Sequence, residues 1–151
     1  MEKGILEGKW GEDSLCFGWT ALPVSLLLLQ QRLGLSPLGI NVLLHLLSQW
    51  WKKESLPYPS QSSIAERMGV STRTVQRELA QMKKNGLLKI TRTSVSDPRF
   101  LGRNVYDPSP LAVKLQKMSL ELFSENELKK KKRMEKSEQL TNTKLHMHGD
   151  A

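Results

Sequence analysis

The amino-acid sequence predicts a mainly α-helical fold, in which a core of three helices is followed by a two-stranded β-hairpin. Three observations predict it. Leucines recur at helical spacing between residues 24 and 47. Two helix caps separated by a glycine follow within residues 60–86. Two short stretches of β-favouring residues come next, on either side of a polar connector. We expect an added strand and helix before this core and one further helix after it.

The chain has 151 residues and a net charge of +8, with 38% hydrophobic residues. This length is suited to one modest domain with extensions. We predict a loose arm at residues 1–16, a domain at residues 17–108, a helix at residues 109–124 and a disordered basic tail at residues 125–151. The positive charge favours a polyanionic partner.

Cysteine use and hydropathy predict the compartment. Cys16 is the single cysteine, so it can form no internal disulfide, and a reducing environment is expected. The first residues do not have the pattern of a signal peptide, and the apolar run at residues 21–29 is too short to span a bilayer. We therefore expect a protein of the bacterial cytosol or nucleoid, without a membrane partner.

Two leucine-rich helices are predicted before residue 52. A short strand at residues 16–22 precedes the first, which begins after Pro23 and ends near Gly34. Its leucines 26, 29 and 33 share one face, which is either buried or a dimer interface. The second helix begins at Pro37 after a Ser36 cap. Its predicted buried positions are Ile40, Leu43, Leu44, Leu47 and Trp51.

The stretch at residues 60–86 predicts two helices joined by a tight turn. Ser60 caps the first helix, and Gly69 can take the positive φ that ends a helix before a sharp turn. Ser71 caps the second helix, whose buried stripe is Val75, Leu79 and Met82.

The opposite side of the second helix carries Arg73, Arg77, Ala80 and Lys84. Such a helix fits the major groove of DNA, where Arg can bind guanine and Gln can bind adenine bidentately. The alternative is an ordinary amphipathic helix whose outer face is only solvated.

The hairpin is predicted from strands at residues 87–93 and 104–107, with a polar connector between them. Arg92, Arg99 and Arg103 on or near this hairpin would reach a phosphate or the minor groove. A final helix begins at Ser109-Pro110, and leucines at 111, 115 and 122 with Met118 form a short seam for docking or self-association. The run at residues 129–133 would add sequence-independent DNA affinity or act only as a solubilising tail.

The spacing of Ala65, Gly69 and Val75 resembles the helix-turn-helix of bacterial and phage DNA-binding proteins. Glu78 departs from that pattern, since many members carry an aliphatic residue there, and Leu79 is expected to replace it. With the hairpin, residues 17–118 resemble the winged helix-turn-helix domains of plasmid and phage replication proteins and of small bacterial regulators. The resemblance implies binding to double-stranded DNA, often as a homodimer.

The predicted DNA-binding residues fall into two sets. Base edges would be contacted by residues on the exposed side of the second helix: Thr72, Arg73, Gln76 and Arg77. The DNA backbone would be contacted by polar and basic side chains around it: Ser60, Gln61, Ser62, Ser71, Lys83, Lys84, Arg92, Arg99 and Arg103. We predict no cofactor, no metal and no enzymatic activity, because no catalytic or metal-ligand set has informative spacing.

Three functions remain open on the sequence. The chain is expected to be a sequence-specific DNA-binding transcriptional regulator. It would alternatively be a replication initiation or accessory protein of a plasmid or phage. A third hypothesis is a winged helix that binds a protein partner and no DNA. Self-association would use either the N-terminal or the C-terminal leucine-rich helix.

Overall fold

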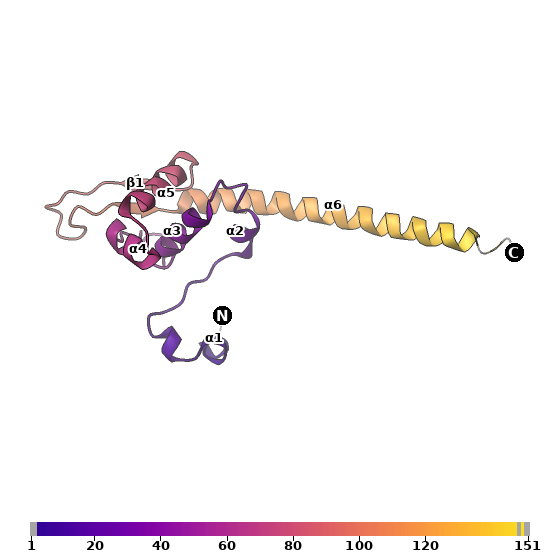
Figure 1. The fold of residues 1–151 in the computed structure, drawn as a ribbon, viewed down its shortest axis with the longest axis horizontal. Helices are drawn as coiled ribbons and strands as arrows, with labels where there is room; N and C mark the ends of the chain where they lie inside the picture. Colours follow the sequence, from indigo (N-terminus) through magenta and orange to yellow (C-terminus); the bar gives the residue numbers. More distant parts are fainter. Residues whose placement is uncertain (1–2, 148, 150–151) are drawn as a thin grey trace. The chain divides into compact units, whose positions relative to one another are not determined.

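The computed structural model describes residues 3–147 and residue 149, and it confirms a mainly α-helical fold with one two-stranded antiparallel sheet (Figure 1). The chain divides into two units, Met1–Ala112 and Val113–Ala151. The elements in order are α1 (Lys3–Trp10), the short 3₁₀ helix η1 (Asp13–Leu15), α2 (Val24–Leu28), α3 (Pro37–Leu47), α4 (Gln61–Met68), α5 (Thr72–Lys84), β1 (Lys89–Thr91), β2 (Val105–Asp107) and α6 (Ser109–Met147).

Helix α3 begins as predicted, with the Ser36 hydroxyl accepting a hydrogen bond from the Gly39 N–H at 2.9 Å. Its predicted buried face is wrong in part. Val42 and Leu46 are completely buried beside Leu43, whereas Trp51 is 62% exposed. The helix ends at Leu47, so Trp51 lies beyond it and cannot continue the stripe.

Helices α4 and α5 form the predicted pair joined by a tight turn. The Ser60 hydroxyl accepts a hydrogen bond from the Ser63 N–H at 3.1 Å, and the Ser71 hydroxyl accepts one from the Thr74 N–H at 3.2 Å. Gly69 has φ of 67°, the left-handed conformation that ends α4. The predicted inner stripe of α5, formed by valine 75, leucine 79 and methionine 82, is buried. Local signals therefore determine both helices.

Glu78 is buried on α5 together with Leu79, and its carboxylate is satisfied from another helix. The Ser36 hydroxyl donates a hydrogen bond to Glu78 Oε2 at 2.8 Å. A Cβ on Gly39 would lie 3.1 Å from the same oxygen, so glycine permits this close approach. Leu79 enters the core as expected, and Glu78 connects α5 to the beginning of α3.

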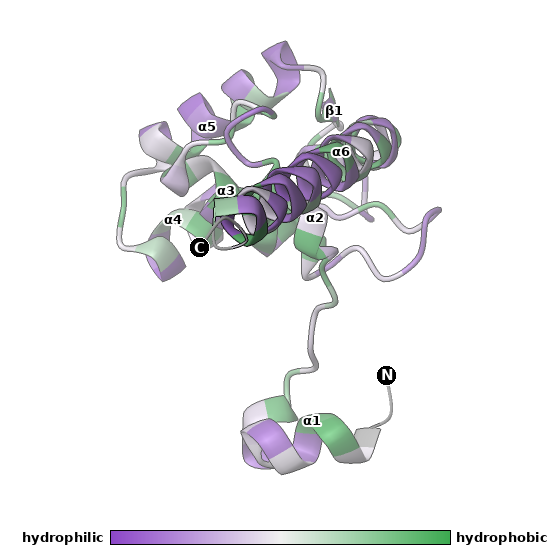
Figure 2. Cartoon of the chain, turned by 90° about the vertical axis from the view of Figure 1, so that its right-hand side faces the viewer, coloured by the Kyte–Doolittle hydropathy of each residue, from purple (hydrophilic) through white to green (hydrophobic). Residues whose placement is uncertain are grey.

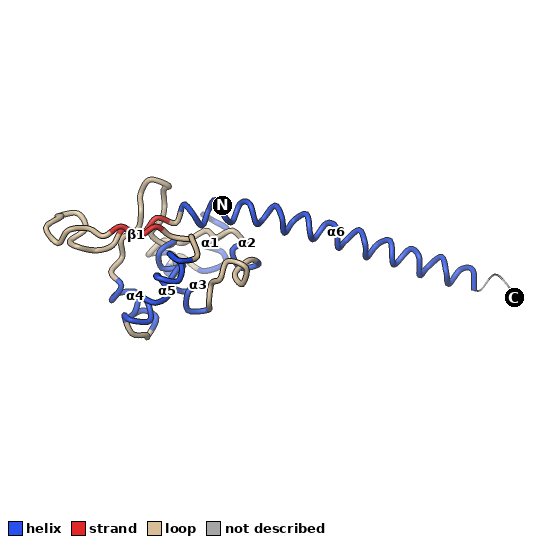
Figure 3. The backbone as a smooth tube through the Cα atoms, turned by 90° about the horizontal axis from the view of Figure 1, so that it is seen from above, coloured by secondary structure: helices blue, strands red, loops and turns tan. Residues whose placement is uncertain are grey.

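The hairpin follows α5 and contains the two predicted strands, each of three residues. Ile90 pairs with Tyr106 in the antiparallel register, and Tyr106 is fully buried. Its N–H also donates to the Pro57 carbonyl at 2.9 Å, which ties β2 to the segment before α4. Figure 3 shows the strands side by side, joined by the extended loop of residues 92–104.

The N-terminal expectations are corrected in three places. Residues 3–10 form helix α1 instead of a loose arm, and residues 16–22 form no strand. Helix α2 ends at Leu28 and continues as turns to Gly34, although leucines 26, 29 and 33 are buried as predicted. The aromatic and β-favouring residues at 16–22 have no described strand with which to pair, so their propensity is not expressed.

The C-terminal boundary also differs from the prediction. Helix α6 runs for 39 residues to Met147 instead of ending at residue 124, and it includes most of the segment for which the sequence predicts disorder. The run contains many Glu, Lys, Leu and Met residues and no proline after Pro110. These residues have high helix propensity, so composition alone did not separate a polar helix from a disordered tail.

Asp107, at the end of β2, gives a prediction for acid stability. Burial acts to raise its pKa, but hydrogen bonds from the Ser109 side chain and N–H, with the charge of Lys89, hold the pKa of Asp107 below its ordinary value. A lowered pKa stabilises the fold above the unfolded-state pKa of about 4, and this stabilisation is lost as the pH falls through the lower folded-state pKa. Asp107→Asn should therefore be less stable than the wild type at pH 7, and the difference should shrink as the pH falls to about 3. Urea unfolding at several pH values measures it, and a difference independent of pH would contradict this role.

Candidate nucleic-acid interface

The outer face of α5 is exposed, as the sequence predicts. Arg73 and Arg77 both point away from the buried stripe, and the Arg77 side chain is 70% exposed. Arg77 Nε lies 3.8 Å from a carboxylate oxygen of Glu78, an ion pair that is accessible to solvent on the arginine side. Much of α5 is hydrophilic in Figure 2. The helix therefore offers a polar surface while its other face is held in the core.

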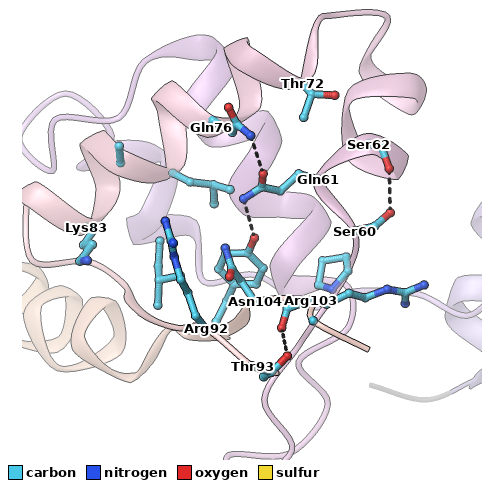
Figure 4. Close-up of a pocket in the computed structure, with 16 residues that line it drawn as sticks. Ser60, Gln61, Ser62, Thr72, Gln76, Lys83, Arg92, Thr93, Arg103 and Asn104 are labelled. Carbon is cyan, nitrogen blue, oxygen red and sulfur yellow. Dashed lines mark hydrogen bonds between the residues drawn. The ribbon is translucent and has the colours of Figure 1, made fainter. Parts of the chain in front are cut away.

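A groove of about 1010 Å³ lies between α5, the beginning of α4 and the hairpin (Figure 4). It is lined by sixteen residues from these elements: Pro59, Ser60, Gln61, Ser62, Thr72, Gln76, Leu79, Ala80, Lys83, Ile90, Arg92, Thr93, Gly102, Arg103, Asn104 and Tyr106. Its walls come from distant segments of the sequence, since Gln61 at the beginning of α4 bonds to Tyr106 on β2, 45 residues away.

The charge on the lining of this groove has one sign. Lys83 from α5, Arg92 after β1 and Arg103 before β2 are its charged members, and all three are exposed. The lining contains no Asp or Glu among the described residues. In Figure 4 Arg92 points upward from the hairpin, whereas the Arg103 side chain extends to the right, away from Arg92. An anionic ligand in the groove would meet cations without a competing carboxylate.

A chain of side-chain hydrogen bonds crosses the groove from α5 to β2. Gln76 Nε2 on α5 donates to Gln61 Oε1 on α4 at 3.1 Å, and Gln61 Nε2 donates to the Tyr106 hydroxyl on β2 at 3.2 Å (Figure 4). The Tyr106 side chain is fully buried, whereas Gln76 is exposed. This chain connects the exposed helix face to the hairpin.

The groove brings together eight of the predicted DNA-binding residues and leaves five outside. The eight are Ser60, Gln61, Ser62, Thr72, Gln76, Lys83, Arg92 and Arg103. The five on neighbouring surfaces are Ser71, Arg73, Arg77, Lys84 and Arg99.

Three of those five residues have structural partners, and that of Arg77 is Glu78. The Ser71 hydroxyl is occupied as the cap of α5, bonded to the Thr74 N–H. The Arg99 guanidinium lies over the Phe100 ring at 4.9 Å, and this ring packs edge-on against Tyr58. Arg99 is therefore positioned on the connecting loop of the hairpin and not on the groove lining.

Sequence reasoning missed Thr93, Asn104 and Tyr106 as groove residues. The Thr93 hydroxyl donates to the Arg103 carbonyl at 2.7 Å, which joins the two sides of the hairpin loop at its base. The alternation of residues 104–107 predicts a strand there, but it does not indicate which face of the strand meets α4. The contact between Tyr106 and Gln61 depends on the hairpin folding back onto α4, so no local sequence pattern predicts it.

Two other kinds of feature were sought in the part of the chain that the structure describes, a metal-binding cluster and a membrane-spanning helix. Within residues 3–147 and 149, no group of three or more His, Cys, Asp and Glu side chains is placed to hold a metal ion. Among the described helices, including the long α6, none carries the apolar run that a bilayer crossing requires.

Comparison with known proteins gives one family match and several structural similarities. Residues 33–88 match the helix-turn-helix domain family. No curated protein matches the chain significantly. The chain is similar to the N-terminal domain of the DnaD protein from Geobacillus kaustophilus HTA426, with 25% identity over 83% of this chain and 97% of that one and a TM-score of 0.54.

Two further solved structures are similar at lower scores. One is the MepR–DNA complex of S. aureus, with 14% identity, 79% and 89% of the two chains covered and a TM-score of 0.44. The other is MarR, with 18% identity, 82% and 88% covered and a TM-score of 0.38. From the family match and the observed helices and hairpin, residues 33–88 form a helix-turn-helix domain, which the β1–β2 hairpin completes as a winged helix-turn-helix.

Proposed function

We propose that the chain binds double-stranded DNA sequence-specifically and acts as a transcriptional regulator. The observation that carries this proposal is the exposed polar face of α5 beside a groove whose charged lining residues are all cations. An α-helix fits the major groove of B-DNA, and cations along its edge neutralise phosphates. Binding alone, without covalent chemistry, would account for the activity.

The residues divide between base and backbone contact by their position on the groove. Thr72, Arg73, Gln76 and Arg77 lie on the exposed side of α5, from which side chains can reach base edges. The phosphates would be held by the first turn of α4 and by the basic side chains around the groove, namely Ser60, Ser62, Lys83, Lys84, Arg92 and Arg103. Ser71 and Arg99 would contact the backbone from outside the groove.

The experiment that tests the proposal is selection of bound sites from random duplexes with the full chain. Recovery of one defined sequence supports it, and failure to enrich any sequence would refute it. The genomic position of the recovered site then assigns the role. A site that overlaps a promoter supports regulation, whereas repeats within a replication origin would replace the regulator with a replication initiation or accessory protein.

Self-association belongs to the same proposal. Val24, Leu27 and Leu28 on α2 are 69%, 57% and 65% exposed, so this helix carries an apolar stripe on its outer side. A second copy seated on that stripe, or one paired through α6, would present two α5 helices to one duplex. Sedimentation of the free chain measures the number of copies, and a palindromic or repeated selected site is expected from a dimer.

Arg77→Ala should reduce affinity for the selected duplex by about 1–3 kcal/mol and relax the preference at one base pair, because a bidentate contact to guanine is lost. Fluorescence anisotropy with the selected duplex and its single-base variants measures both effects. Arg67→Ala is the matched control, since Arg67 is an exposed arginine on α4 outside the groove lining. Equal losses in the two variants would show that Arg77 contributes only general charge. A protein-interaction module would give a different result. In that case no duplex would be selected, and Arg77→Ala would bind the protein partner as well as the wild type does.

A further inference from the structure

The hydrogen-bond chain from Gln76 through Gln61 to Tyr106 fixes the orientation of an amide on the exposed face of α5. Its two links are 3.1 Å and 3.2 Å long, and they join residues 15 and 45 positions apart in the sequence. Tyr106 is the rigid end, because its side chain is fully buried and its N–H is bonded to the Pro57 carbonyl. Gln61 is the first residue of α4, immediately after the Ser60 cap, so its backbone is also held.

Both polar atoms of the Gln61 side chain are used within the protein. Its Oε1 accepts from Gln76 and its Nε2 donates to Tyr106. The second N–H of Gln61 Nε2 still remains for a phosphate, so both bonds can persist when DNA is bound. The assignment of Gln61 to the DNA backbone stays a prediction, and the two bonds give the same side chain a role inside the protein.

We infer that Gln61 and Tyr106 are positioning residues that set the Gln76 amide to read adenine, an inference that rests on the proposed function. Gln76 uses one N–H of its Nε2 toward Gln61, which leaves its second N–H and its carbonyl Oε1 for a ligand. Adenine presents an N6 donor beside an N7 acceptor in the major groove, the pair that a glutamine amide matches bidentately. The hydrogen bond to Gln61 orients this amide before DNA arrives.

Orientation before binding lowers the conformational entropy lost on binding, and it also selects against other bases. A glutamine held in one orientation cannot rotate its amide to suit guanine or thymine as readily as an unrestrained one can. The chain of bonds therefore specifies preference at one base pair, which distinguishes its effect from that of a phosphate contact.

The test compares Tyr106→Phe and Gln61→Ala with the wild type on the selected duplex and on duplexes changed at one base pair. Tyr106→Phe keeps the buried ring and the backbone bond to Pro57 and removes only the hydroxyl. Both variants should lower the preference for A·T at the base pair read by Gln76 by about 3- to 10-fold, the effect of one hydrogen bond. Preferences at the other base pairs should be unchanged. Thermal unfolding of each variant confirms that it is folded.

Two further variants separate orientation from general affinity. Gln61→Glu should retain the A·T preference, because a carboxylate accepts from both Gln76 and Tyr106, while its charge weakens binding to all duplexes alike. Ser62 is a neighbouring groove residue, and Ser62→Ala should weaken binding to all duplexes about equally.

The outcomes are distinguishable. If folded Tyr106→Phe and Gln61→Ala bind the selected duplex with wild-type preference at every base pair, the inference is wrong and the proposed function stands. If Gln76→Ala does not change preference at any A·T pair, the inference is equally wrong. If the wild type selects no duplex sequence, the proposed function fails and the inference fails with it.

Discussion

Reversing the charge of two groove residues should abolish most of the DNA affinity while leaving the fold intact. Lys83→Glu combined with Arg92→Glu removes two cations from opposite sides of the groove, one on α5 and one on the hairpin. Hydrogen bonds to charged groups contribute about 1.5–3 kcal/mol each, so the loss should be about 3–6 kcal/mol. Both side chains are exposed, so the free energy of unfolding should change by less than about 0.5 kcal/mol per substitution.

The measurement is a titration of affinity against salt concentration. Each lost phosphate contact reduces the magnitude of the slope of log K against log salt by about 1. The slope of the double variant should therefore be smaller in magnitude than that of the wild type by about 2. Lys52→Glu with Lys53→Glu is the matched control, because it produces the same change in net charge at exposed positions outside the groove. Charges farther from the duplex than the Debye length of about 10 Å at 0.1 M salt are largely screened. Comparable losses in the two double variants would mean that the overall charge, and not the groove, attracts DNA.

The α4–turn–α5 unit could be predicted from the sequence because its determinants are local. Ser60 and Ser71 each bond an N–H three residues ahead, and Gly69 adopts the one conformation that makes glycine favourable. The exposure of Arg73 and Arg77 follows from the helical period once Val75 is placed inside. None of these inferences needs knowledge of a distant residue.

The composition of the groove could not be predicted in the same way. Thr72 and Arg73 are adjacent and the sequence predicts base contact for both, yet Thr72 lines the groove and Arg73 lies on the outer surface of α5. The side of α5 that faces the hairpin depends on how β2 packs against α4. That packing involves Tyr106 and Gln61, which are 45 residues apart.

The leucines of α3 show a second limit of periodicity, and they provide the last prediction. In a helix with leucine or valine at most inner and outer positions, two neighbouring faces satisfy a 3.6-residue repeat about equally well. The sequence favoured the face with Leu47, whereas Leu46 is completely buried and Leu47 is partly exposed. Tertiary contact with α5 decides between them, because α3 and α5 pack on each other.

Leu46→Ala should therefore destabilise the domain by about 2–5 kcal/mol, because a fully packed leucine leaves a cavity. Leu47→Ala removes the same atoms from the next position, and partial exposure should limit its cost to about 1 kcal/mol. Both changes have the same effect on helix propensity, so their difference isolates burial. Urea unfolding of the two variants measures it, and an equal or larger cost at Leu47 would place the wrong face of α3 in the core. Since α5 rests on this face, such a result would also change which residues of α5 are available to DNA.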